Sequence, residues 1–442
     1  MKNKSFLYNK LYDYYKQLIL SGKLPAGTRL PSIRRCSELQ GMSKTTVEQA
    51  YMLLCDDGYL IPRSQSGYYV SDKAKTVVEN SGAESAEVKE EKALSDYTST
   101  GVDIEAFDLD IWSRYIKSAL RHSERLMDYG EPQGEQGLRR RIAEYVKETR
   151  NCVCSENDIV IGAGVQTLLN ILCPLVETNS KTVYFSDSGY RQGIAVFKSH
   201  GCKITDTSEK AHILYVSPSH MSAAGDIMEI SDRHELVSTA KRNGQLIIED
   251  DYDSEFRDLS KPTPSLQGLD SENVVYIGTF SKMLLPSIRI SYMILPQKLL
   301  KRYARIKELY NQTVSIPDQL ALEQFIADGR LSAQLRKAKK LYSQKSRLLS
   351  AELERVFGND ISVVKMPTPL YVKCVLNSSV SFSSAEKMLS QGERAVKIIC
   401  VNESTEKLTL AFSVSSVPLQ FIKGDVSRIR QCFCELNSKQ NF

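Results

Sequence analysis

A lysine with hydroxyl neighbours and a nearby arginine is the strongest chemical signal in the chain. The segment reads Gly278-Thr-Phe-Ser-Lys282, and Arg289 follows seven residues later. A lysine amine at the end of a strand can condense with an aldehyde to form a Schiff base. Thr279 and Ser281 would then donate hydrogen bonds to a phosphate, and Arg289 would pair with that phosphate through two parallel hydrogen bonds. The segment therefore predicts a phosphorylated aldehyde bonded to Lys282.

An acidic segment one strand upstream completes this chemistry. Ile247-Ile-Glu-Asp-Asp-Tyr-Asp-Ser-Glu-Phe-Arg257 follows an apolar strand and places Asp250 at its C-terminal end. A pyridine cofactor needs a carboxylate at its ring nitrogen, because the protonated ring is the better electron sink. We assign that role to Asp250, and Tyr252 would donate to the phenolic oxygen of the cofactor. An acidic loop after a strand is common by itself, but the two segments together predict a site for pyridoxal phosphate.

The chain around these residues alternates helices with short apolar runs from about residue 96 onward. Continuous apolar strands separated by helices are typical of a mostly parallel sheet that helices cover on both faces. The runs lie at residues 159–161, 183–185, 213–216, 246–248, 274–277 and 291–295. We predict an α/β unit over residues 96–442, with a large subdomain at about 125–300 and a small C-terminal subdomain at about 325–442.

The first 72 residues have a different pattern. Ser32 and Ser43 are suited to cap the N-termini of helices, and Gly58 is suited to end the third helix. The expected elements are helices at residues 5–20, from about 33, and at 44–57, and strands at 59–61 and 67–70. Two helices, a turn, a third helix and a hairpin are the order of a winged helix-turn-helix, which we place at residues 1–72.

The third helix of this domain predicts contacts with a double-stranded DNA operator. Its first turn is polar, whereas Val47, Ala50, Leu53 and Leu54 form an apolar face that can pack on the core. Arginine, lysine and hydroxyl side chains would meet phosphates, and the turn of the hairpin would reach the neighbouring groove. The candidate DNA-binding residues are Arg34, Arg35, Ser43, Lys44, Thr45, Thr46, Gln49, Arg63 and Gln65.

Composition separates the two units and suggests different partners for them. Residues 73–95 are rich in Glu, Lys, Ala and Ser and poor in aromatic residues, which predicts a linker. Residues 1–70 carry ten Lys and Arg against five Asp and Glu, while the other 372 residues carry 48 of each sign. All of the excess positive charge therefore lies in the small N-terminal unit, which favours an anionic partner such as DNA.

Several classes of protein are disfavoured by the sequence. No apolar run approaches the roughly 20 residues that a membrane helix needs, and residues 1–10 lack the apolar core of a signal peptide. We therefore expect a cytoplasmic protein. The ten cysteines are scattered, and the Cys-x-Cys pairs at 152–154 and 432–434 do not have zinc-site spacing, so we expect reduced thiols and no metal site.

Two sets of motifs resemble one family of regulators. Residues 24–35 and 42–60 closely resemble the GntR-type winged helix, and this resemblance covers nearly all of residues 6–71. With the lysine and aspartate segments, and with Tyr129-Gly-Glu-Pro-Gln-Gly134, the chain resembles the MocR/GabR family. Such regulators join a GntR-type head to a body built like a fold-type I aminotransferase, so the resemblance implies a PLP-binding body and a homodimer.

The resemblance adds further candidates for the cofactor site. Gly162-Ala-Gly-Val-Gln166 opens a helix whose free N–H groups can bind phosphate, and Val165 and Gln166 are the expected donors. By resemblance, Tyr190 would stack on the pyridine ring and His220 would lie near the phenolic oxygen. Tyr129 would reach the phosphate of the partner subunit.

The chain also departs from this family at the substrate side. Thr409 stands where the family commonly has an arginine that grips a substrate carboxylate. Gln192 stands where the GABA-sensing members have a second arginine, although Arg191 is adjacent, and residues 220–225 differ as well. Because threonine cannot form a bidentate clamp, we infer that the cofactor pocket is kept and the usual amino-acid pocket is not.

Three functions stay open from the sequence. The chain can be a regulator in which PLP, or an amine or amino acid that reacts with PLP, changes the spacing of two DNA-binding heads. It can be a working aminotransferase that carries a DNA-binding head, although the loss of the arginine argues against efficient turnover. In a third reading PLP itself is the signal, because such a regulator needs the cofactor pocket but no carboxylate clamp.

Overall fold

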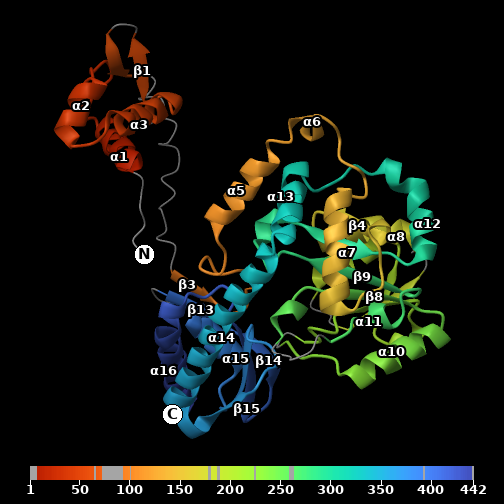
Figure 1. The fold of residues 1–442 in the computed structure, drawn as a ribbon. Coiled ribbons are helices and arrows are strands. Elements are labelled where there is room, and N and C mark those ends of the chain that lie inside the picture. Colours follow the sequence, from red (N-terminus) through yellow and green to blue (C-terminus); the bar gives the residue numbers. More distant parts are fainter. Residues whose placement is uncertain are drawn as a thin grey trace. The chain divides into compact units, whose positions relative to one another are not determined.

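The protein divides into two compact units, residues 1–91 and residues 92–442 (Figure 1). The computed structural model describes residues 7–63, 66–71, 93–99, 101–177, 181–186, 190–222, 225–257, 263–391 and 394–440. Within these residues, no helix combines the length and apolar character needed to cross a membrane.

The first unit is a winged helix, as the sequence predicted. Its elements are α1 (Leu7–Leu20), α2 (Ile33–Gln40), α3 (Lys44–Asp56), β1 (Leu60–Arg63) and β2 (Gly67–Val70). Ser32 caps α2 by accepting from Arg35 N at 3.2 Å, and Ser43 caps α3 by accepting from Thr46 N at 3.1 Å. Strands β1 and β2 pair in antiparallel register to form the wing. Gln65, at the tip of the wing, lies outside the described residues.

One part of the predicted apolar face of α3 is wrong. Val47, Ala50, Tyr51 and Leu54 are buried, whereas Leu53 is 37% exposed. The buried positions are spaced by three, one and three residues, which keeps them on one side of the helix, and Leu53 falls outside this stripe. Tyr51 therefore fills the core position that the sequence assigned to Leu53.

The second unit is built around a seven-stranded sheet whose strand order is β4-β10-β9-β8-β7-β5-β6. Its strands are β4 (Ile159–Gly162), β5 (Thr182–Phe185), β6 (Lys203–Thr205), β7 (Ile213–Val216), β8 (Leu246–Asp251), β9 (Val274–Thr279) and β10 (Ser291–Ile294). Strand β10 runs antiparallel to both of its neighbours, and the other pairs are parallel. The predicted α/β class with a mostly parallel sheet is confirmed.

Helices cover both faces of this sheet, because its central strands are apolar on both sides. Along β9, Tyr276 packs into a core with α7 (Gln136–Arg150) and α13 (Ile316–Ala327), and Val274 packs against α10 (Ile230–Arg242) and α11 (Leu266–Leu269). Val275 and Ile277 point to the other face, into a core with α8 (Val165–Leu175), α9 (Arg191–Ser199) and α12 (Gln297–Ile306). The result is a three-layer arrangement (Figure 1).

The C-terminal part adds a smaller antiparallel sheet of order β11-β12-β15-β14. Its strands are β11 (Ile361–Val364), β12 (Tyr371–Asn377), β14 (Ile399–Glu403) and β15 (Lys407–Ser413), accompanied by α14 (Arg330–Phe357), α15 (Phe382–Leu389) and α16 (Ile422–Gln440). Helices α14 and α16 pack against each other. Together with this sheet they contribute to the same hydrophobic core as Tyr276, α7 and α13. Two further α-helices among the described residues of this unit are α5 (Leu109–Ala119) and α6 (Ser123–Leu126).

The start of the second unit differs slightly from the prediction. Strand β3 (Ala93–Asp96) pairs in parallel with β13 (Arg394–Lys397), so residues 93–95 belong to the folded unit and not to the predicted linker at 73–95. A four-residue strand of mixed polarity gives no clear signal in the sequence, because its stability comes from its partner strand. Residues 72–92, most of the predicted linker, lie outside the described residues.

Candidate ligand-binding cavity and nucleic-acid interface

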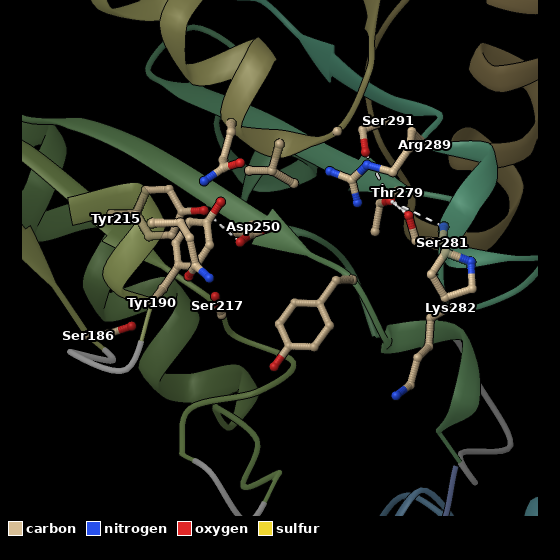
Figure 2. A pocket seen from close by; sticks show the side chains of 16 residues that line it. Ser186, Tyr190, Tyr215, Ser217, Asp250, Thr279, Ser281, Lys282, Arg289 and Ser291 are labelled. Carbon is tan, nitrogen blue, oxygen red and sulfur yellow. Dashed lines mark hydrogen bonds between the residues drawn. The ribbon is translucent and has the colours of Figure 1, made fainter. Parts of the chain in front are cut away.

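A cavity of about 650 Å³ opens where strands β8 and β9 end. In open α/β sheets, ligands commonly bind outside the carboxyl ends of the strands. Nine of the eleven residues that the sequence assigned to a cofactor line this cavity. They are Val165, Gln166, Tyr190, Asp250, Tyr252, Thr279, Ser281, Lys282 and Arg289. Figure 2 shows Tyr190, Tyr215 and Asp250 grouped on one side and Arg289, Thr279, Ser281 and Ser291 on another.

Asp250 brings a buried carboxylate to the cavity. Its Oδ2 accepts a hydrogen bond from the Tyr215 hydroxyl at 2.6 Å, whereas its Oδ1 has no hydrogen-bond partner among the described residues. Burial, with smaller contributions from Asp251 and Asp253, raises the pKa of Asp250 from 3.8 to about 7 despite the bond from Tyr215. A cation placed against this carboxylate would favour its charged form.

Lys282 brings a buried amine to the same cavity. It follows β9 and is 5% exposed, and its Nζ donates a hydrogen bond to Ser415 Oγ at 3.1 Å. Burial lowers the pKa of Lys282 from 10.5 to about 8, although the carboxylate of Asp253 opposes this shift. A lowered pKa gives the lysine a larger neutral fraction near neutral pH, and the neutral amine is the nucleophilic form.

Hydroxyl groups and a guanidinium form a polar wall. Ser291 Oγ donates to Thr279 Oγ1 at 2.9 Å, and Thr279 Oγ1 donates to Ser281 Oγ at 3.0 Å. Arg289 lies just beyond them, and its backbone is in the left-handed region with φ 56°. A side chain other than glycine is uncommon in this conformation, and such strain gathers at functional sites.

The N-terminus of α8 faces this wall. Its N-cap, Gly164, has φ 92°, and a Cβ at that position would collide with the Arg289 guanidinium. Glycine therefore allows the arginine to lie against the start of the helix. Gly164 supplies no side-chain cap, and the first-turn N–H groups of a helix have no acceptor within the helix. The backbone N–H groups of Val165 and Gln166 therefore add hydrogen-bond donors to the side of the cavity that holds Arg289. The positive end of the helix dipole lies on the same side.

Aromatic rings line the opposite side. The Tyr190 ring stacks on the Tyr215 ring, with centroids 5.7 Å apart and planes 28° apart. Tyr215 stacks in turn on Phe185 at 4.8 Å. Because Tyr215 also holds Asp250, this stack fixes both a flat surface and the carboxylate next to it.

Two predicted cofactor residues do not line the cavity. His220 is buried behind Tyr252, with ring centroids 4.9 Å apart, and its Nδ1 lies 3.0 Å from Asp253 Oδ2. Tyr129 lies between α6 and α7 and is 95% exposed. His220 therefore contacts the lining residue Tyr252 without belonging to the lining itself, and Tyr129 lies on the surface of this chain.

Sequence reasoning missed Tyr215, Ser291 and Ser415. Tyr215 lies in a strand that the sequence marks as an apolar run, and a tyrosine within an aliphatic strand is a usable sign of a polar partner. Ser291 begins β10, and its position beside Thr279 depends on the antiparallel register of β9 and β10. Ser415 follows β15, more than a hundred residues from Lys282, and no local pattern could have paired them.

The departures on the substrate side are visible in the structure. Gln192, in the first turn of α9, lines the cavity. Thr409, on β15 opposite Val375, is half-buried and does not belong to the lining. Among the described residues that line the cavity, Arg289 is the only arginine. A second bidentate carboxylate clamp is therefore missing from the described lining.

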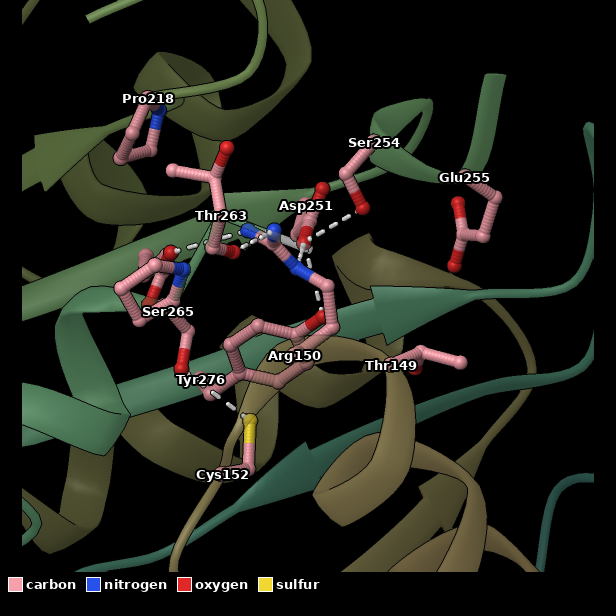
Figure 3. A network of polar contacts seen from close by, with 12 residues as sticks. Thr149, Arg150, Cys152, Pro218, Asp251, Ser254, Glu255, Thr263, Ser265 and Tyr276 are labelled. Carbon is pink, nitrogen blue, oxygen red and sulfur yellow. Dashed lines mark hydrogen bonds and ion pairs between the residues drawn. The ribbon is translucent and has the colours of Figure 1, made fainter. Parts of the chain in front are cut away.

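A network of buried polar groups surrounds Arg150 and Asp251, the residue that follows Asp250 in the chain (Figure 3). Arg150 Nε donates to Asp251 Oδ2 at 2.6 Å, and its Nη1 donates to Thr263 O at 2.5 Å. Tyr276 and Ser254 donate to the same Asp251 oxygen at 2.8 and 2.9 Å. Burial alone would raise the pKa of Asp251, but Arg150 and these hydrogen bonds bring it below 3.8. The network thus fixes the end of β8 immediately beside Asp250.

The first unit presents most of the predicted DNA-binding side chains to solvent. Arg34, Arg35, Ser43, Lys44, Thr45, Gln49 and Arg63 are exposed, and Thr46 is half-buried. Both Arg34 and Arg35 form ion pairs with Glu38, at 3.4 and 3.6 Å. Ser43 and Thr46 share a hydrogen bond of 2.8 Å at the N-terminus of α3. The Arg63 guanidinium lies over the Tyr69 ring at 4.5 Å, which holds it on the wing.

Comparisons with known proteins agree with both units. The family model described as bacterial regulatory proteins, gntR family, matches residues 7–70. The HTH-type transcriptional regulator YdeL of Bacillus subtilis is 35% identical over 92% of this chain and 93% of its own length. A probable rhizopine catabolism regulatory protein, MocR of Rhizobium meliloti, is 30% identical over 81% of this chain and 79% of its own. The chain belongs to the MocR family. The chain is a transcriptional regulator with a DNA-binding GntR domain.

Solved structures identify the fold of the second unit. The α-aminoadipate aminotransferase LysN of Thermus thermophilus, complexed with N-(5'-phosphopyridoxyl)-L-leucine, aligns with a TM-score of 0.64. The alignment covers 78% of the MocR-type chain and 93% of LysN at 18% identity. The second unit therefore has the aminotransferase fold, as predicted.

Proposed function

We propose that this MocR-type chain is a transcription regulator whose aminotransferase-like unit binds PLP at Lys282. In this proposal the unit senses either PLP itself or an amine or amino acid that reacts with it. When bound, PLP supplies an aldehyde that condenses with primary amines and a protonated ring that draws electrons. The proposal depends on one observation: a buried lysine amine, a buried carboxylate and an arginine with hydroxyl neighbours line a single cavity.

The carboxylate side of the cavity fits the ring of the cofactor. Asp250 has an oxygen without a hydrogen-bond partner among the described residues, and a protonated pyridine nitrogen is both a donor and a cation. The stacked Tyr190 ring offers a flat surface for the pyridine. Tyr252 is our candidate donor to the phenolic oxygen, and His220 would act on it through Tyr252.

The opposite wall fits a phosphate. Arg289 offers a guanidinium that can bind two phosphate oxygens, and Thr279 and Ser281 offer hydroxyls. Val165 and Gln166 add N–H groups at the positive end of α8. These donor types are the ones that protein sites use for phosphate dianions. We propose that they hold the cofactor in place while Lys282 bonds to it.

Lys282 is suited to form the covalent bond. With a pKa of about 8, the amine is neutral in about a tenth of molecules at neutral pH, far more than for an ordinary lysine. Lys282 would hold the cofactor through its amine nitrogen, and the cofactor would supply the aldehyde for that bond. Ser415 accepts from this amine and can orient it before the reaction.

The substrate side favours a signal that lacks the usual carboxylate clamp. Thr409 and Gln192 cannot grip a carboxylate as arginine does. This supports PLP itself, or an amine without an α-carboxylate, over a common α-amino acid as the effector. Exposure of Tyr129 is compatible with its proposed role at the phosphate of a partner subunit, and hence with a homodimer.

DNA binding would use the exposed residues of α2, α3 and the wing. Arg34, Arg35 and Lys44 would pair with phosphates, and the polar start of α3 would enter the major groove. In a homodimer, two such heads would require a repeated operator. Binding of the effector would change operator affinity only if it favours one arrangement of the two heads over the other.

The deciding experiment titrates PLP into the purified apo-protein and records the visible absorbance and the affinity for a labelled operator. Borohydride reduction followed by mass spectrometry should then locate the cofactor on Lys282. Lys282→Ala should remove the absorbance change, whereas Lys298→Ala, at an exposed lysine of α12, should retain it. A protein that stays colourless, or an adduct on a different residue, would overturn the assignment.

A catalytic aminotransferase is the second candidate. Lys282, Asp250 and Tyr252 line the same cavity, so chemistry on an amine is possible there. A steady-state assay with several amino donors and keto acids tests this reading. Multiple turnovers with the wild type, absent from Lys282→Ala, would favour the enzyme over the regulator.

A further inference from the structure

The junction segment, residues 93–99, lies against the region that holds Lys282. It contains β3 and the turn that follows, and it is the first described part of the second unit after the residues that join the two units. The Tyr97 N–H donates to Lys397 O at 2.9 Å, and the Ser413 N–H donates to Tyr97 O at 2.8 Å. The side chain of Tyr97 is fully buried and donates to Asp425 at 2.9 Å.

A chain of buried hydroxyls runs from Lys282 to this segment. Lys282 Nζ donates to Ser415 Oγ at 3.1 Å, and Ser415 Oγ lies 3.0 Å from Ser413 Oγ. Ser413 Oγ donates to Ser99 O at 2.8 Å, and Ser415 Oγ also reaches Ser99 O at 3.4 Å. Both serines are almost completely buried, so water cannot easily replace a lost partner.

We infer that Ser415 is a positioning residue that couples Lys282 to the junction segment, so that covalent occupation of Lys282 loosens residues 93–99. This inference rests on the proposed function, because the trigger is the binding of an aldehyde at Lys282. It adds a regulatory route inside the chain, from the amine to the segment that continues toward the DNA-binding unit.

The direction follows from counting hydrogens. The neutral lysine amine, which is the form that reacts, carries two N–H donors, and a serine hydroxyl has one hydrogen and two acceptor positions. When the amine condenses with an aldehyde, nitrogen bonds to carbon and the aldehyde oxygen leaves as water with two hydrogens. The nitrogen is then drawn toward that carbon and no longer donates to Ser415. Ser415 can instead accept from Ser413, which takes the hydrogen of Ser413 away from Ser99 O.

Amide hydrogen exchange of the full-length protein can test this coupling, with mass spectrometry of peptides that cover residues 93–101. We expect Lys282→Ala and Ser415→Ala each to speed exchange there by about fivefold or more in the apo-protein. The double variant should exchange no faster than either single variant, because both changes break one chain of bonds. Independent, additive effects, or no effect of Lys282→Ala, would overturn the inference.

Ser416→Ala is the matched control. The Ser416 hydroxyl donates to Asp96 O at 3.2 Å, so it holds the same segment through a different bond. Its removal should speed exchange, but the effect should add to that of Lys282→Ala. Ser413→Ala breaks the chain one bond later and should behave like Ser415→Ala, which keeps the test decisive if one variant fails to fold.

Addition of PLP separates this inference from the proposed function. In the wild type, PLP should raise the visible absorbance and speed exchange of residues 93–101. In Ser413→Ala the absorbance should still rise, while exchange should not increase further. A colourless wild type would overturn PLP binding, whereas the apo variants would still decide the coupling. A coloured wild type whose exchange is unchanged would overturn the coupling alone.

Discussion

Asp250 and Asp251 are neighbours on β8, yet they belong to two different regions of the molecule. Successive side chains of a strand point to opposite faces, so Asp250 meets the cavity and Asp251 meets the buried network (Figures 2 and 3). Asp251 receives Arg150 and two hydroxyls, whereas Asp250 receives only the Tyr215 hydroxyl from the described residues. The pKa of Asp251 is lowered by its partners, and that of Asp250 is raised by burial.

The difference separates a structural carboxylate from one suited to a ligand. A buried carboxylate with a cationic partner is neutralised within the fold and has a structural role. A buried carboxylate without such a partner is unfavourable in its charged form until a cation arrives. Neither aspartate has both of its oxygens hydrogen-bonded within the described residues, so the charge of the partner, and not the number of unfilled positions, distinguishes the two.

Breaking the network should have the largest effect on stability. Arg150→Met leaves Asp251 and Glu249 buried without their main cation, and we expect a loss of about 3–5 kcal/mol in unfolding free energy. Urea denaturation of the second unit would measure it. Arg141→Met, which removes an exposed pair with Glu144, should cost under about 1 kcal/mol. Equal losses in the two variants would contradict the structural role of the network.

Asp250 and Asp251 should make the stability of the fold depend on pH in opposite directions. The pKa of Asp250 rises from 3.8 to about 7 on folding, so its charged form destabilises the apo-protein as pH rises between these values. Asp250→Asn should therefore gain stability over the wild type in that window, by at most about 4 kcal/mol. The lowered pKa of Asp251 stabilises the fold above 3.8, and that stability is lost as pH falls.

Unfolding free energies of both Asn variants, measured from about pH 2 to pH 8, test this contrast. Asp251→Asn should lose stability relative to the wild type at the upper end, and the difference should shrink toward acid. If both substitutions shifted stability in the same direction across the window, the division of β8 into a cavity face and a network face would be wrong.

Asp250→Asn should stabilise the apo-protein but weaken its affinity for PLP. Asp250→Asn removes the charge that would meet the ring nitrogen, and a charge-assisted hydrogen bond contributes about 1.5–3 kcal/mol. That corresponds to a loss of about 10- to 100-fold in PLP affinity. Titration monitored by absorbance measures it, with Tyr215→Phe as a weaker variant that leaves the carboxylate in place. An Asp250→Asn protein with unchanged affinity would remove Asp250 from the site.

Much of the cavity could be predicted from the sequence, because the motifs that form it lie at strand ends that are recognisable within short segments. The strand before Asp250 and the strand before Lys282 end at the same edge of a parallel sheet, so their terminal side chains must converge. The winged helix was predictable for a similar reason, because Ser32, Ser43 and Gly58 mark the ends of its helices within a few residues.

Contacts between distant segments could not be predicted. Ser415, Tyr215 and Ser291 reach the cavity through register and packing that no single segment encodes. The sequence assigns residues 93–95 to the linker, because the short strand that they form depends on its partner, β13, about 300 residues away. The prediction that Leu53 is buried was wrong. Leu53 and Leu54 are chemically alike, and only the structure shows that α3 buries Tyr51 and Leu54.

The smallest effect lies in the DNA-binding unit, and it should leave the cavity untouched. Lys44 is exposed at the start of α3, and Lys44→Ala should flatten the dependence of operator affinity on salt by about one unit of slope. Arg34→Ala should have a smaller effect, since Arg34 already pairs with Glu38. Glu38→Gln should strengthen binding, because it releases both arginines of α2. PLP uptake should stay unchanged in all three variants, and a salt dependence that no variant alters would exclude this face as the DNA contact.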